Sequence, residues 1–153
     1  MQILGIRTSS KAIRYAILEW DKQKVTFLNS GTENKLDYPA SIQTVEQKLN
    51  WLYQEIERVL RQYNSIEHIV VKTNEYVREK AATRQSTYMD GVIMLIAAQR
   101  GKKLSTKLYA NIQKGLGSKK IQAFAEQVAS RSAKYWNTQM ADAVVAAWSG
   151  GND

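Results

Sequence analysis

One arginine and three carboxylates are the side chains whose type and position point most directly to chemistry. Arg7 follows the apolar segment Ile3–Ile6, which predicts a strand that ends at this arginine. Asp142 lies in a mainly apolar segment, and Glu75 and Asp90 are the other acidic candidates. Two Mg²⁺ ions that catalyse phosphodiester cleavage need several carboxylates at one point. A guanidinium is no metal ligand, so we expect Arg7 to form a bidentate pair with Asp142.

Each of these residues also has a simpler interpretation. Arg7 could be a solvent-facing strand end, and Glu75 a residue of a surface loop. Asp90 could be either a boundary residue or a residue paired with a nearby arginine such as Arg84 or Arg100. The sequence leaves these alternatives open.

Basic residues are the second chemical signal. The net charge is +8, and residues 74–153 hold twelve basic against six acidic side chains. Such an excess favours a polyanionic partner. The candidates for nucleic-acid binding follow the central strand or surround two glycines before a helix expected to begin at Ser118: Arg78, Lys80, Arg84, Lys114, Gly115, Gly117, Lys119 and Lys120. Glycines allow a phosphate to approach the main chain closely, and the start of a helix adds N–H donors. The lysines near these glycines can equally be solvated surface residues.

Composition excludes several classes of protein. The chain has no cysteine and one histidine, His68, which excludes a disulfide scaffold and a Cys/His zinc site. Its longest mainly apolar run, residues 91–98, is too short to cross a bilayer. We therefore expect no membrane association and a cytoplasmic location.

Hydrophobic periodicity predicts the elements that must position these side chains. Strands are expected at 2–7, 11–20 and 23–28 as an antiparallel meander, then at 69–73 and 104–109. Helices are expected at 42–63, 81–100, 118–132 and 138–148. The order βββαβαβαα predicts an α/β fold with a five-stranded mixed sheet flanked by helices. It would form one domain over residues 1–149, followed by a short tail at 150–153.

Four stretches in this order resemble one known family. They are the N-terminal hairpin and the segments 89–98, 112–120 and 140–147, the last of which contains Ala141-Asp142-Ala143. Together they are similar to RuvC-like Holliday-junction resolvases, which have the RNase H-like fold. The resemblance covers nearly the whole chain and implies that fold.

The resemblance also implies four carboxylate positions for catalytic magnesium. They lie at the end of the first strand, at the end of the central strand, and one turn apart in the last helix. In this sequence those positions carry Arg7, Thr73, Gln139 and Asp142. Only Asp142 is a carboxylate, so the resemblance implies a degenerate catalytic pocket with no bound metal.

Three functions follow as hypotheses. The leading one is a catalytically degenerate RuvC-like domain that binds branched or duplex nucleic acid, or a protein partner, without cleavage and without a cofactor. The alternative is a magnesium-dependent, structure-selective endonuclease with a rearranged set of Glu75, Asp90 and Asp142. The third is a dimeric assembly or regulatory module that does not bind nucleic acid. RuvC-like proteins are typically dimers, so a homodimer is expected.

Overall fold

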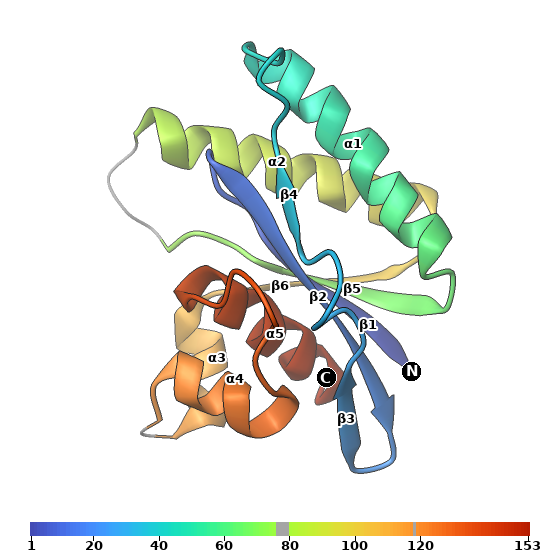
Figure 1. Ribbon diagram of the computed structural model, residues 1–153, viewed down its shortest axis with the longest axis vertical. Coiled ribbons are helices and arrows are strands. Elements are labelled where there is room, and N and C mark those ends of the chain that lie inside the picture. The colour runs from blue at the N-terminus through green and yellow to red at the C-terminus, as the bar shows by residue number, and fades with distance from the viewer. Residues whose placement is uncertain (76–79, 118) are drawn as a thin grey trace.

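The computed structural model describes residues 1–75, 80–117 and 119–153, and within these it contains six strands and five helices. In chain order they are β1 (Gln2–Arg7), β2 (Ala12–Asp21), β3 (Lys24–Phe27), β4 (Lys35–Asp37), α1 (Val45–Gln62), β5 (Ile66–Lys72), α2 (Ala81–Gln99), β6 (Lys103–Lys107), α3 (Tyr109–Leu116), α4 (Ile121–Ala129) and α5 (Thr138–Gly151) (Figure 1). None of the helices in these ranges is long and apolar enough to span a membrane.

The strands form one mixed sheet in the order β3-β2-β1-β5-β6, with β4 paired to β2. The β1–β2 and β2–β3 pairs are antiparallel, whereas β1–β5 and β5–β6 are parallel. The hairpin turns are too short for any other arrangement, while the helical connections allow parallel neighbours. The predicted α/β class, the meander and the mixed sheet are therefore confirmed.

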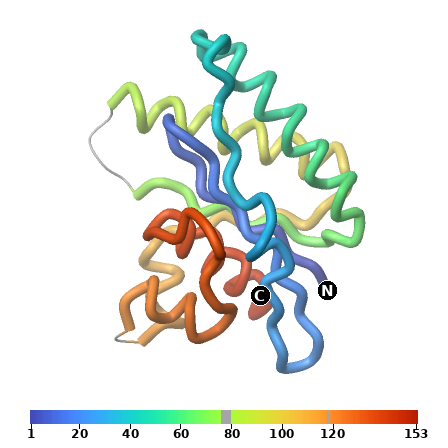
Figure 2. The backbone as a smooth tube through the Cα atoms, in the orientation of Figure 1, coloured from blue at the N-terminus to red at the C-terminus, as the bar shows by residue number. Residues whose placement is uncertain are grey.

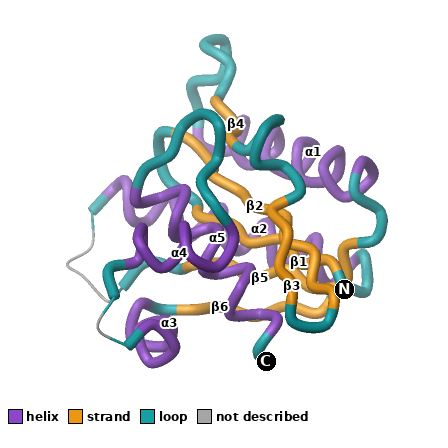
Figure 3. Tube along the Cα trace, turned by 60° about the horizontal axis from the view of Figure 1, so that its bottom comes forward, coloured by secondary structure: helices purple, strands orange, loops and turns teal. Residues whose placement is uncertain are grey.

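Two short elements were not predicted. β4 has only three residues and exists because Lys35–Asp37 pairs with Ala12–Arg14 on β2 as the chain returns toward α1 (Figure 2). The segment 112–117, expected as a glycine-containing loop, is largely helix α3, which follows β6 directly (Figure 3). Ile112 and Leu116, four residues apart, are both buried in this helix. The two glycines in this segment concealed that periodicity.

Helices cover both faces of the sheet (Figure 1). Successive side chains of a strand point to opposite faces, so Ile3 joins an apolar cluster with α3, α4 and α5, whereas Leu4 joins one with α1 and α2. This alternation explains why both faces are apolar in the interior of β1 and in the segment Ile69–Val71 of β5. It also means that residues one apart at a strand end face different helices.

The ends of the helices follow local capping chemistry. Thr44 accepts a hydrogen bond from the Gln47 N–H, so α1 begins at Val45 rather than at residue 42. Asn137 caps α5, because its side chain accepts a hydrogen bond from the Met140 N–H. The predicted cap Ser118 lies outside the described residues, and α4 begins at Ile121 after Lys120.

Helix α5 lies unusually close to the sheet. A Cβ atom added to Gly5 would overlap the Ala143 carbonyl oxygen and the Ala147 backbone. At its other end, α5 runs to Gly151, and Gly150 packs directly against Val70. Gly150 and Gly151, which were predicted to begin a short tail, are thus the last residues of α5, whereas Asn152 and Asp153 follow the helix and are exposed.

Candidate functional site

The end of β1 and the end of β5 carry two neighbouring cations. Arg7 and Lys72 are register partners in the parallel β1–β5 ladder, so both side chains point to the face covered by α5. The Lys72 side chain is 0% exposed. The central-strand position of the pocket, predicted to be Thr73, is thus occupied by Lys72. Thr73 faces the opposite side of the sheet and its hydroxyl contacts the Lys107 carbonyl at 3.4 Å.

The predicted contact between Arg7 and Asp142 is present. Arg7 Nε lies 3.2 Å from Asp142 Oδ2, and the carboxylate is 2% exposed. The pair is not bidentate, because the other guanidinium contacts are made by Nη1 with the side chain of Asn74 at 2.8 Å and the Lys72 carbonyl at 3.5 Å. The Tyr109 hydroxyl also donates to the Asp142 carboxylate and lies 2.7 and 2.8 Å from its two oxygens. Burial raises the pKa of Asp142, and the Tyr109 hydrogen bond and Arg7 oppose that rise.

The Lys72 ammonium is neutralised by a different carboxylate, that of Glu75. It lies 3.2 Å from Glu75 Oε1, donates to the Thr73 carbonyl at 2.7 Å and sits 3.8 Å from the centre of the Tyr109 ring. Glu75 also accepts the Tyr109 backbone N–H at 2.6 Å, which lowers the pKa of this carboxyl together with Lys72. Burial and the charge of Arg7 lower the pKa of Lys72. The Arg7–Asp142 and Lys72–Glu75 pairs form a neutral four-charge cluster around Tyr109.

These two cations belong to a longer row that sequence analysis missed. Register pairs connect five strands in the order Lys35, Arg14, Arg7, Lys72, Lys107. Neighbours in such a row have Cβ atoms roughly 5 Å apart, so like charges repel. The row could be found only from strand register, because its members are scattered over residues 7–107.

Most members of the cationic row have their own carboxylate. Lys35 pairs with Asp37 at 2.8 Å, and Lys107 pairs with Asp153 at 2.5 Å. Arg14 is different: it is 9% exposed, and its Nε and Nη1 have no hydrogen-bond partner among the described residues. Burial lowers the pKa of Arg14. Its guanidinium lies 5.9 Å from the centre of the Tyr135 ring, a cation–π distance.

Asp90 lies on the opposite face of the sheet from this cluster. It is 4% exposed and accepts a hydrogen bond of 2.6 Å from the Thr8 hydroxyl. Burial raises its pKa to about 6, although the Thr8 hydrogen bond and the charges of Arg7 and Lys72 act against the rise. Arg100, one of its predicted partners, pairs instead with Glu57.

The rearranged carboxylate set is therefore not assembled. Glu75 and Asp142 are each held by a cation and by Tyr109. Asp90 lines a cleft together with Glu75, but its carboxylate accepts a hydrogen bond from Thr8 instead. Within residues 1–75, 80–117 and 119–153, no three His, Cys, Asp or Glu side chains come together in a way that could hold a metal ion. Arg7 and Lys72 supply the wrong charge for the magnesium site that the fold resemblance implied.

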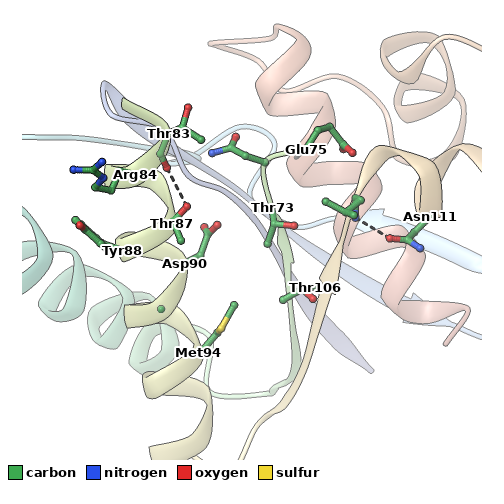
Figure 4. A pocket seen from close by; sticks show the side chains of 13 residues that line it. Thr73, Glu75, Thr83, Arg84, Thr87, Tyr88, Asp90, Met94, Thr106 and Asn111 are labelled. Carbon is green, nitrogen blue, oxygen red and sulfur yellow. Dashed lines mark hydrogen bonds between the residues drawn. The ribbon is translucent and has the colours of Figure 1, made fainter. Parts of the chain in front are cut away.

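A cleft of about 790 Å³ lies between α2 and the ends of β5 and β6 (Figure 4). Asp90 and Met94 point into it from α2, and Thr73 and Thr106 face them from the strands. Its walls carry several hydroxyl groups and two carboxyl groups, Glu75 and Asp90. Arg84 and Tyr88 extend from α2 away from the strands (Figure 4).

The predicted nucleic-acid residues fall into two groups on different sides of the sheet (Figure 1). Lys80 and Arg84 lie at the start of α2 and are exposed, while Arg78 lies outside the described residues. Lys114, Lys119 and Lys120 are exposed on α3 and before α4.

The two glycines have structural roles in α3. Gly115 faces Trp148 on α5, where an added Cβ would lie 3.2 Å from the indole. Gly117 ends the helix with φ +66°, a backbone conformation that favours glycine. Neither position requires a phosphate to explain its glycine.

Comparisons with known proteins identify the fold. No protein-family model matches the sequence, and no curated protein does. Among solved structures, Thermus thermophilus RuvC in complex with a Holliday junction substrate has a TM-score of 0.78 at 13% identity, over 96% of this chain and 90% of that chain. The yeast mitochondrial Holliday junction resolvase Ydc2 has a TM-score of 0.68 at 14% identity, over 95% of this chain and 75% of that chain. The fowlpox virus resolvase in complex with Holliday junction DNA has a TM-score of 0.59 at 14% identity, over 99% of this chain and 97% of that chain. The chain has a RuvC-like fold, as predicted.

Proposed function

We propose that this chain of RuvC-like fold is a nucleic-acid-binding domain that does not cleave at the ends of β1 and β5. One observation carries the proposal: Arg7 and Lys72 occupy the two adjacent strand ends and are neutralised internally by Asp142 and Glu75. The charge that magnesium ions would supply in a two-metal nuclease is supplied here by the protein itself.

The residues at this site do not fit a divalent cation. Binding one would require Asp142 and Glu75 to leave their cationic partners, and the ion would then lie beside Arg7 and Lys72. Two unit charges 4 Å apart interact by about 4 kcal/mol at an effective dielectric constant of 20, and here that term is repulsive. We therefore derive no cleavage step through a metal.

The charge and the fold both favour a nucleic-acid partner. The chain carries a net charge of +8. Two of the solved structures that share its fold, those of T. thermophilus and fowlpox virus, are complexes with Holliday junction DNA. Branched DNA is therefore the substrate class to test first.

Gel-shift assays with a four-way DNA junction, a duplex and a single strand test the binding. We expect binding at 50 mM salt that weakens steeply by 200 mM, because phosphate contacts release counterions. An absence of binding to all three nucleic acids at low salt would overturn the nucleic-acid proposal and leave a protein-binding domain or the dimeric assembly module. Light scattering on the same samples measures the oligomeric state, for which we propose a homodimer.

A cleavage assay separates this proposal from the nuclease alternative. Wild-type protein with Mg²⁺ or Mn²⁺ is expected to leave junction, flap and RNA–DNA hybrid substrates intact. The matched control is Asp142→Asn, which should behave like wild type in this assay. Metal-dependent cleavage that is lost in Asp142→Asn would overturn the proposal in favour of the nuclease.

A further inference from the structure

A small polar hollow of about 300 Å³ opens beside Arg7. The turn between β1 and β2 forms one wall, and the first turns of α2 and α5 form others. Its charged lining residues are Arg7 and Lys11, and apart from Ala82 the rest carry hydroxyl or amide groups. The described lining contains no carboxylate, because Asp142 lies beneath Arg7 and does not line the hollow.

Arg7 presents an unused donor at this place. Its Nε faces Asp142 and its Nη1 donates to Asn74, but Nη2 has no partner among the described residues. The contacts on Nε and Nη1 hold the guanidinium in one orientation. A planar, pre-oriented guanidinium with a free N–H edge suits a phosphate oxygen.

The opposite wall adds backbone donors. Ala82 and Thr83 lie in the first turn of α2, whose N-cap residue Lys80 makes no side-chain capping bond. Gln139 lies in the first turn of α5. The first backbone N–H groups of a helix have no intrahelical acceptor and carry partial positive charge. Two helix starts therefore add to the positive potential of Arg7 and Lys11.

The β1–β2 turn is ordered before any ligand arrives. Ser9 Oγ accepts the Lys11 N–H at 3.1 Å and the Ala12 N–H at 3.4 Å. Lys11 itself is exposed, so its ammonium can reach a ligand at little structural cost. Hydrogen-bond donors and cations thus line the hollow, and the turn that carries Lys11 is held by hydrogen bonds of its own.

We infer that this hollow binds a phosphate group, held by the Arg7 guanidinium, the Lys11 ammonium and the hydroxyls and N–H groups around them. The inference rests on the proposed function, which makes the backbone phosphate of a DNA strand the expected source. A free phosphate ion has the same chemistry, so the experiment uses both probes. In this reading Arg7 binds the phosphate directly, at the strand end where a nuclease would bind it through metal.

NMR titration with inorganic phosphate tests the hollow independently of nucleic acid. We expect the amide signals of Ser10, Lys11 and Thr83 to shift with saturation. Lys11→Gln should weaken this binding at least threefold, whereas Lys24→Gln, which removes the same charge from an exposed site on β3, should not. Shifts elsewhere in the chain, or equal weakening by both variants, would overturn the inference.

Gln139→Glu gives a second test that preserves the fold. A carboxylate in the first turn of α5 is favourable for the helix, but it places a negative charge in the hollow. We expect phosphate affinity to fall tenfold or more, with Gln54→Glu on the exposed face of α1 as the control. Unchanged affinity in Gln139→Glu would contradict a phosphate at this place.

Binding of four-way junction DNA then shows whether the phosphate in the hollow comes from a DNA strand. If the hollow binds a strand phosphate, Lys11→Gln and Gln139→Glu weaken junction binding more than their controls at the same salt. Junction binding that is equal in variants and controls would show that the hollow does not take a DNA phosphate, while the proposed function stands. If wild type binds no nucleic acid, the proposed function fails and the phosphate titration still decides whether the hollow takes the free ion.

Discussion

At the end of β1, a guanidinium holds the buried carboxylate of α5. Asp142 has three stabilising neighbours, of which Arg7 and Lys72 are charged and Tyr109 donates a hydrogen bond. A buried carboxylate is tolerated only when it is paired and hydrogen-bonded. The effects of substitutions in this cluster on the free energy of unfolding should therefore be strongly coupled.

Removal of Arg7 should be costly because it leaves Asp142 without its nearest cation. We expect Arg7→Met to lower the free energy of unfolding by about 3 kcal/mol. In Arg7→Met/Asp142→Asn the combined loss should be smaller than the sum of the single losses by about 1–2 kcal/mol. Urea unfolding of the four proteins measures this coupling.

A surface pair provides the comparison for that cycle. Asp37, whose side chain is 59% exposed, pairs with Lys35. Asp37→Asn should cost less than about 1 kcal/mol. Strict additivity of Arg7→Met and Asp142→Asn would show that the pair contributes no more than this exposed one.

Asp90 should make stability depend on pH. Its pKa is raised from 3.8 to about 6, so the folded state binds a proton more tightly than the unfolded chain. The contribution of Asp90 to the free energy of unfolding is therefore present below about pH 4 and is lost as the pH rises from about 4 to 6, a change of about 3 kcal/mol. Thr8 contacts Asp90 directly, and the charges of Arg7 and Lys72 act on it from the other face of the sheet.

Asp90→Asn isolates this effect. Asparagine can still accept the Thr8 hydrogen bond but carries no charge, so the variant should gain stability over wild type between pH 4 and 6 and keep the gain at pH 8. Urea unfolding across this range measures the difference. A difference between the two proteins that does not change with pH would mean that Asp90 titrates at its ordinary pKa.

At the scale of elements, the packing of α5 on β1 sets the distance between Asp142 and the strand ends. Gly5 allows this approach because any side chain would meet the α5 backbone. The same contact brings the first turn of α5 to the hollow beside Arg7. A small residue in one strand thus positions two functional features.

Gly5→Ala should separate the helix from the sheet. We expect a loss of about 3 kcal/mol or more, since backbone atoms of Ala143 and Ala147 cannot move aside cheaply. Gly91→Ala is the control: it lies in α2 with nothing within 4 Å of an added Cβ, and should raise stability by about 0.5–1 kcal/mol. Thermal unfolding distinguishes the two. Equal effects would contradict the close approach of α5.

At the scale of the whole molecule, the cationic charge is divided between the interior and the surface. The row from Lys35 to Lys107 is largely covered and mostly neutralised by carboxylates. Under the proposed function, long-range attraction of nucleic acid would therefore depend on exposed lysines and on the excess charge. The buried cations of the row would act only on a ligand group that comes into direct contact with them.

Reversal of the α3–α4 lysines tests this division. The triple variant Lys114→Glu/Lys119→Glu/Lys120→Glu should weaken junction binding regardless of sequence and reduce the dependence of log affinity on log salt by about three. Its control reverses three exposed lysines elsewhere, Lys22, Lys24 and Lys103. Equal effects from both triples would mean that net charge alone governs binding. Fluorescence anisotropy at several salt concentrations provides the measurement.

Much of the architecture was determined by the sequence alone. Alternating strands and helical periodicity located the meander, α1, the central strand, α2 and α5, and the order of elements indicated the RuvC-like fold. Local patterns carry this information because side-chain direction repeats every 2.0 or 3.6 residues. β4 and α3 escaped prediction, one because it is too short for a pattern and the other because its glycines resemble a loop.

The site was determined by tertiary structure. Sequence analysis predicted the Arg7–Asp142 pair but placed Thr73 where Lys72 lies, because a shift of one residue along a strand moves a side chain to the other face. The contacts of Tyr109, the five-residue cationic row and the hollow beside Arg7 join segments far apart in the chain. Register and helix packing bring such segments together, and neither leaves a local pattern in the sequence.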